Sequence, residues 1–78
     1  MQSSDFIGID VAKATLEIAT ADASSPTQTV ANDRTAIRSW LATLPATAQL
    51  ALESTGRYHE LAVELAGGRG LRVYLVNP

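Results

Sequence analysis

The stretch FIGIDVAKATLEIAT, residues 6–20, decides the fold because it contains two strands and the turn between them. Residues 5–11 form an apolar run, and residues 14–20 alternate between apolar and polar side chains, as strands do. The letters VAKA between them are few enough for an antiparallel hairpin. Asp10 is an anomaly in the first strand, because burying an unpaired carboxylate costs several kcal/mol unless a cation compensates.

The middle of the chain predicts a loop, a strand and a helix. DASSPT, residues 22–27, is a loop by composition, and Pro26 excludes a central strand there. TQTVAN, residues 27–32, is a short third strand. The helix that follows has Asn32 or Asp33 as its cap and ends before Pro45. Its apolar stripe has the spacing i, i+3, i+4 and i+7 and consists of Ile37, Trp40, Leu41 and Leu44.

The last third predicts a strand, a helix and a strand. AQLALE, residues 48–53, is a short apolar strand that ends on Glu53. Ser54 or Thr55 is expected to cap the second helix, which glycines end. LRVYLVN, residues 71–77, is the fifth strand. The buried stripe expected on the second helix consists of Tyr58, Leu61, Ala62 and Leu65, and the terminating glycines are Gly67, Gly68 and Gly70.

The predicted order is therefore β-β-β-α-β-α-β, an α/β fold. Short loops make the first three strands antiparallel, whereas the helices make the later connections parallel, right-handed crossovers. The sequence stops after a strand with no helix behind it, so we expect residues 1–78 to be the incomplete N-terminal part of a larger domain.

Composition excludes several classes of protein. No apolar run approaches the roughly 20 residues that span a bilayer, and the N-terminus lacks the pattern of a signal peptide. The chain has no cysteine, so a cytoplasmic location is expected. The net charge is −2, whereas domains that bind DNA through its phosphates usually have a basic surface. We therefore expect either that these residues do not bind nucleic acid or that the binding surface lies in another part of the protein.

Asp10 and Glu53 are candidate metal ligands. They are far apart in the sequence, but if the first and fourth strands are adjacent and parallel, both carboxylates lie near the same edge of the sheet. Carboxylate oxygens suit Mg²⁺ or Mn²⁺. The residues alone leave a second interpretation open, in which Asp10 starts a turn and Glu53 precedes a helix cap.

Four segments carry a likeness to a known family: FIGIDVAKATLEIA, NDRTAIRSWLATLP, ALESTGRYHELAVEL and RVYLVNP. In this order they resemble the N-terminal domain of the DEDD-type insertion-sequence transposases, which is similar to RuvC-type Holliday-junction resolvases. The resemblance implies a ribonuclease H-like mixed sheet of five strands in the order 3-2-1-4-5. It also implies metal-dependent DNA cleavage and strand transfer, with DNA as partner, a homo-oligomer, and in the intact protein a structured guide RNA.

The resemblance places the first two family carboxylates on Asp10 and Glu53, as catalytic residues and ligands of Mg²⁺ or Mn²⁺. The other two family aspartates and a C-terminal domain with a nucleophilic serine fall outside this sequence, so these residues alone are expected to be inactive. Lys13 and Arg57 are possible phosphate contacts, with Arg57 expected in the first turn of the second helix. Each has an ordinary alternative: a solvated turn lysine, and an arginine paired with a nearby glutamate.

Two other functions remain open from the sequence. An actin-like ATPase also has a phosphate loop after a first strand that reads like IGID, although Val11, Ala12 and Lys13 stand where glycines are usual. A non-catalytic dimerisation module would use an uncovered edge or face of the sheet.

Overall fold

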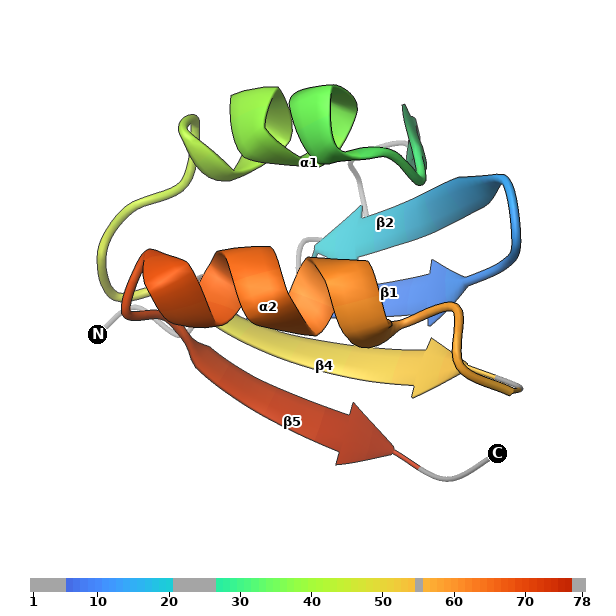
Figure 1. The fold of residues 1–78 in the computed structure, drawn as a ribbon. Helices are drawn as coiled ribbons and strands as arrows, with labels where there is room; N and C mark the ends of the chain where they lie inside the picture. The colour runs from blue at the N-terminus through green and yellow to red at the C-terminus, as the bar shows by residue number, and fades with distance from the viewer. Residues whose placement is uncertain (1–5, 21–26, 55, 77–78) are drawn as a thin grey trace.

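The computed structural model describes residues 6–20, 27–54 and 56–76, which form a single mixed sheet with two helices (Figure 1). The strands follow the order β3-β2-β1-β4-β5. The pairs β1–β2 and β2–β3 are antiparallel, and β1–β4 and β4–β5 are parallel. The α/β class and the ribonuclease H-like order are therefore confirmed. The elements are β1 (Phe6–Val11), β2 (Thr15–Thr20), β3 (Gln28–Ala31), α1 (Arg34–Leu41), β4 (Gln49–Ser54), α2 (Glu60–Gly68) and β5 (Arg72–Val76).

A tight turn joins β1 to β2, as the short VAKA segment predicts. The backbone N–H of Ala12 donates to the carbonyl of Thr15 at 2.9 Å. This contact fixes the register of the hairpin, in which Val11 pairs with Leu16. Because side chains alternate along a strand, the register also decides which residues of β1 and β2 share a face.

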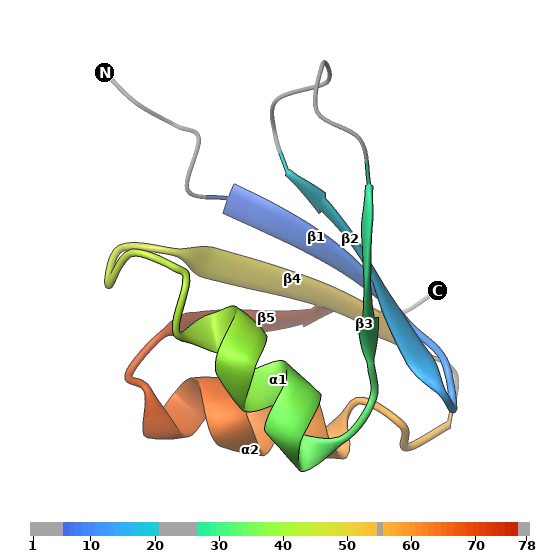
Figure 2. The same ribbon diagram turned by 90° about the horizontal axis from the view of Figure 1, so that it is seen from above.

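Both helices pack on the same face of the sheet, and the described residues place no element on the other face (Figures 1 and 2). The covered face is apolar because alternate residues of each strand are large aliphatics. The helices add Ile37, Trp40 and Leu65, so Trp40 is a core residue as predicted. The strand residues in this core are Ile7, Ile9, Val11, Leu16, Ile18, Val30, Leu50 and Leu52. We call the uncovered side the open face.

Helix α1 begins where the sequence predicts, with Asp33 as its cap. The carboxylate of Asp33 accepts a hydrogen bond from the backbone N–H of Ala36 at 2.8 Å. Asn32, the alternative cap, makes other contacts. At the far end the guanidinium of Arg69 donates to the carbonyl of Leu41 and, at 3.3 Å, to that of Leu44. These bonds tie the residue that follows α2 to the end of α1 and to the turn just beyond it.

Helix α2 begins later than predicted, at Glu60, and its cap position is His59, which makes no capping side-chain bond. The prediction of a cap at Ser54 or Thr55 is wrong: Ser54 still belongs to β4, and Thr55 lies outside the described residues. The reason is Gly56, whose φ of 71° is incompatible with a helix that starts there.

The delayed start removes Tyr58 from the predicted helical stripe. Tyr58 lies in the turn before α2 and is 42% exposed, so the prediction of a core residue is wrong. Ala62 and Leu65, which share the stripe further on, are buried as expected. The loop predicted around Pro26 lies mostly outside the described residues. Neither α1 nor α2, the helices among the described residues, could cross a membrane.

Candidate functional site

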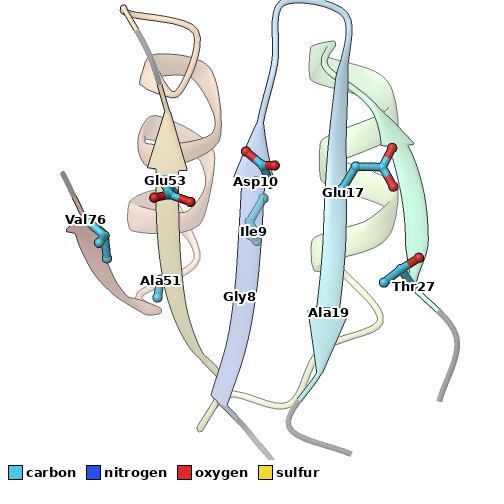
Figure 3. A pocket seen from close by; sticks show the side chains of 9 residues that line it. All are labelled: Gly8, Ile9, Asp10, Glu17, Ala19, Thr27, Ala51, Glu53 and Val76. Carbon is cyan, nitrogen blue, oxygen red and sulfur yellow. The ribbon is translucent and has the colours of Figure 1, made fainter. Parts of the chain in front are cut away.

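Asp10 and Glu53 are brought together by the pairing of β1 with β4. They are direct partners in the parallel register, and each is the last residue but one of its strand. Neighbouring strands lie about 4.8 Å apart, so the two backbones are adjacent. Both side chains are on the open face at the carboxyl ends of the strands (Figure 3). The predicted convergence of the two residues is therefore observed.

Asp10 is exposed, which corrects the expectation of a buried charge. Its neighbours Ile9 and Val11 point into the core, so the alternation of the strand turns Asp10 outward. Among the described residues no hydrogen bond or ion pair engages the carboxylate of Asp10 or of Glu53. Their oxygen atoms are available to an external cation.

A third carboxylate, Glu17, lies on the same face and was not singled out from the sequence. The hairpin register pairs it with Asp10, so Glu17, Asp10 and Glu53 form a row across β2, β1 and β4 (Figure 3). Glu17 turns toward β3, where the hydroxyl of Thr29 donates to its carboxylate at 3.0 Å. The length of the turn between β1 and β2 sets the register of the hairpin, so it could have predicted that Glu17 lies opposite Asp10.

The floor of the open face is made of small residues. A hollow of about 440 Å³ extends from the row of carboxylates over Gly8, Ala19 and Ala51. Large side chains at these positions would fill it. The hollow therefore leaves room against the sheet beside Asp10 and Glu53.

Asn32 connects the two turns that follow β1 and β4. Its side-chain Nδ2 donates to the carbonyl of Ala12 at 2.9 Å and to that of Tyr58 at 3.1 Å. Its own backbone N–H donates to the carbonyl of Ala14 at 2.9 Å. Asn32 therefore fixes the spacing of the turns beside the carboxylates, a role that its position before a helix does not reveal.

Lys13 and Arg57 lie in these two turns, at the same end of the sheet as the carboxylates. Lys13 is exposed in the hairpin turn, as predicted. Arg57 precedes α2, so its prediction in the first turn of that helix is wrong, again because Gly56 delays the helix. The guanidinium of Arg57 lies 3.8 Å from Glu60, and both side chains are more than half exposed (83% and 63%). Such a pair is weak and can exchange for another anion.

His59 is half-buried at the start of α2. Its Nδ1 is buried without a hydrogen-bond partner among the described residues, and so is Oδ1 of Asn32. His59 does not line the hollow beside the carboxylates. Its position is that of a packing residue of the turn.

Residues 7–78 match the family model of the IS110-type DEDD transposases, described as transposase. The chain belongs to this transposase family. The match covers nearly the whole sequence and includes every candidate site residue, so it favours the transposase over the actin-like ATPase. A search of curated proteins finds no match to this transposase chain.

The donor set of this transposase chain fits a hard divalent cation in part. Two free carboxylates on adjacent strands are the ligand type that Mg²⁺ and Mn²⁺ prefer. The described residues, however, contain no group of three or more side chains that could hold a metal ion. Asp10 and Glu53 can therefore supply only some of the ligands of a complete site.

Proposed function

We propose that this chain supplies the first two carboxylates, Asp10 and Glu53, of a divalent-metal site that cleaves DNA and transfers strands during transposition. The observation that carries the proposal is the direct pairing of these residues across β1 and β4 on the open face. Membership of a DEDD transposase family supports it, because the resemblance in sequence implies that Asp10 and Glu53 are the first two of the family's four acidic residues.

The chain's own residues would position the cation at the edge of the sheet. Hydrogen bonds of the sheet hold β1 and β4 in register, so the carboxylates need little rearrangement to share an ion. When bound, Mg²⁺ or Mn²⁺ would help to activate a nucleophile and stabilise the leaving oxygen of a phosphodiester. The small residues of the floor leave space for the substrate beside the carboxylates.

Lys13 and Arg57 are proposed contacts for the phosphates of that substrate. Both lie in turns at the carboxylate end, and Asn32 holds those turns together. Arg57 would exchange Glu60 for a phosphate, because a guanidinium forms stronger, bidentate hydrogen bonds with phosphate than this long ion pair provides. Lys13 would contribute a point charge.

We further propose that activity depends on two more carboxylates and on a C-terminal domain. We also propose that the protein is a homo-oligomer, uses a structured guide RNA and is located in the cytoplasm. Residues 1–78 alone are expected to bind the cation weakly and to lack cleavage activity, because two carboxylates leave most of its coordination to water.

The test is a titration of the ¹⁵N-labelled chain with Mn²⁺, followed by NMR. We expect paramagnetic broadening centred on residues around Asp10 and Glu53. Either Asp10→Asn or Glu53→Gln should abolish the localised broadening, because each removes one of two charged ligands.

Glu17→Gln is the matched control, since it removes the third carboxylate of the row but one that Thr29 already engages. The broadening should persist in this variant. Broadening that is centred elsewhere, or that survives both Asp10→Asn and Glu53→Gln, would contradict the proposed site.

A further inference from the structure

Half of the cationic side chains of this acidic chain lie along one groove, away from the proposed catalytic residues. Three of the six lysines and arginines line a hollow of about 530 Å³ between α1 and α2: Arg34, Arg38 and Arg69. Among the described residues, the one acidic side chain that lines it is that of Glu64. The groove thus carries an excess of positive charge on a chain whose net charge is −2.

The three arginines differ in what already engages them. Arg69 is held by the carbonyls at the end of α1, so it has a structural role. Arg34 pairs with Glu64 at 3.5 Å, and the two side chains are 48% and 64% exposed. An exposed pair of this kind contributes little to stability, so Arg34 can exchange Glu64 for another anion. Arg38 has no ion-pair partner among the described residues. Arg38, and Arg34 with its weak pair, are therefore available to an anion.

A glycine in the wall of the groove is the second observation. Gly68 lies in the last turn of α2 with an ordinary φ, and an added Cβ would meet nothing within 4 Å. Neither the backbone nor the packing therefore requires glycine at this position, so a larger residue can replace it without strain. Because Gly68 has no Cβ, the wall of the groove at this position is bare backbone, which a ligand can approach closely.

We infer that the α1–α2 groove binds the phosphodiester backbone of DNA, with Arg34 and Arg38 as the contacts and Gly68 as the point of closest approach. Guanidinium groups match phosphate geometry, and no base-reading element is needed for such binding. The inference rests on the proposed function for the identity of the polyanion. It adds a second surface, because the groove lies on the helix side of the sheet whereas Asp10 and Glu53 lie on the open face (Figures 1 and 3).

The position of the groove has a consequence for the bound DNA. Phosphates held between the helices cannot belong to the short stretch that enters the carboxylate edge, because the sheet separates the two surfaces. The groove would hold another segment of DNA, and it would do so without the metal ion.

The experiment is an NMR titration of the ¹⁵N-labelled chain with a short DNA duplex at several salt concentrations, without divalent cations. We expect shift changes at Arg38 and Gly68. Arg38→Gln should weaken binding about tenfold, as expected for the loss of a charge-assisted hydrogen bond. It should also reduce the slope of log affinity against log salt by about 0.9, the value for one phosphate contact.

A pair of glycine variants separates groove binding from general electrostatics. Gly68→Glu places a carboxylate in the groove, whereas Gly67→Glu adds the same charge at a neighbouring exposed position that does not line it. Both replace glycine by a better helix former, so α2 should persist. We expect Gly68→Glu to abolish the shift changes in the groove and Gly67→Glu to leave them largely intact.

Four results would overturn the inference: equal weakening by the two glycine variants, binding of an RNA hairpin but not of DNA, binding of inorganic phosphate but not of DNA, or shift changes confined to Lys13 and Arg57. The last result would leave the proposed function standing, because DNA would then bind only at the carboxylate end. Conversely, if the unaltered chain shows no Mn²⁺ broadening around Asp10 and Glu53 while the groove still binds DNA, the proposed function alone is contradicted.

Discussion

Asn32 and Asp33 are adjacent and nearly identical in shape, yet they make different hydrogen bonds. Asp33 accepts from the first turn of α1, whereas Asn32 donates to the carbonyls of Ala12 and Tyr58. An acceptor suffices at a helix cap, but two carbonyl groups require a donor. From the sequence either residue could be the cap; only the positions of the two turns distinguish them.

Exchanging the amide and the carboxylate at these positions should therefore have unequal effects. Asn32→Asp removes both donors and places a carboxylate oxygen against two carbonyl oxygens, so we expect a loss of about 1–3 kcal/mol in the free energy of unfolding. Asp33→Asn keeps the capping oxygen and should change the free energy of unfolding by less than about 0.5 kcal/mol. Urea denaturation measures both. Equal effects of the two variants would show that Asn32 does not hold the turns together.

At the scale of an element, α2 shows how glycines determine where a helix begins and ends. Gly56 delays its start, and Gly70, with φ of 78°, follows its end. The backbone N–H of Gly70 donates to the carbonyl of Gly67, and that of Leu71 donates to the carbonyl of Ala66. These bonds close the helix and direct the chain into β5. Gly67, in contrast, has an ordinary φ and open space around it.

Alanine should thus have opposite effects at two glycines of the same helix end. Gly67→Ala should stabilise the chain by about 0.5–1 kcal/mol, because it lowers the entropy of the unfolded state and strains nothing. Gly70→Ala should destabilise it by about 1–2 kcal/mol, because an L residue resists a left-handed backbone. Thermal unfolding followed by circular dichroism compares them. Stabilisation by Gly70→Ala would mean that the positive φ is not retained in solution.

At the scale of the whole molecule, the described residues form two layers, with one face of the sheet covered by the helices and the other open. The described core lies entirely between the helices and the sheet, and none of the buried side chains is polar or charged. The carboxylate row and the small residues occupy the opposite side. Stability and the proposed chemistry are therefore assigned to opposite faces of the same strands.

Two leucines that are register partners test how far the covered face determines stability. Leu52 of β4 is fully buried, whereas its partner Leu75 of β5 is 55% exposed at the edge of the sheet. Leu52→Ala should cost about 2–5 kcal/mol and Leu75→Ala less than about 1 kcal/mol. Urea denaturation gives both values, and similar costs would show that Leu75 contributes to the core as Leu52 does.

A milder variant is needed because a chain of this length has a total stability of only about 4–12 kcal/mol. Leu52→Ala could leave too little folded protein for a measurement. Ile9→Val, in the same core, should cost about 0.5–1.5 kcal/mol and keep the chain folded.

The sequence by itself determined the order of the elements, the strand order inferred from the family likeness, and the identity of Asp10 and Glu53 as candidate ligands. These follow from local patterns: period-2 alternation, apolar spacing along the helices, and motifs that span few residues. The start of α2, the exposure of Tyr58 and the contacts of Asn32 were decided only by the tertiary structure. Each depends on a backbone angle or on a turn distant in the sequence.

The same distinction holds for the two proposed surfaces. Asp10 and Glu53 could be placed together in advance because parallel neighbours bring their carboxyl ends to one edge. The row with Glu17 required the register of the hairpin, and the arginine groove required the packing of α1 against α2. Contacts between side chains of separate elements depend on how the sheet and the helices pack, and a local pattern in the sequence does not determine that packing.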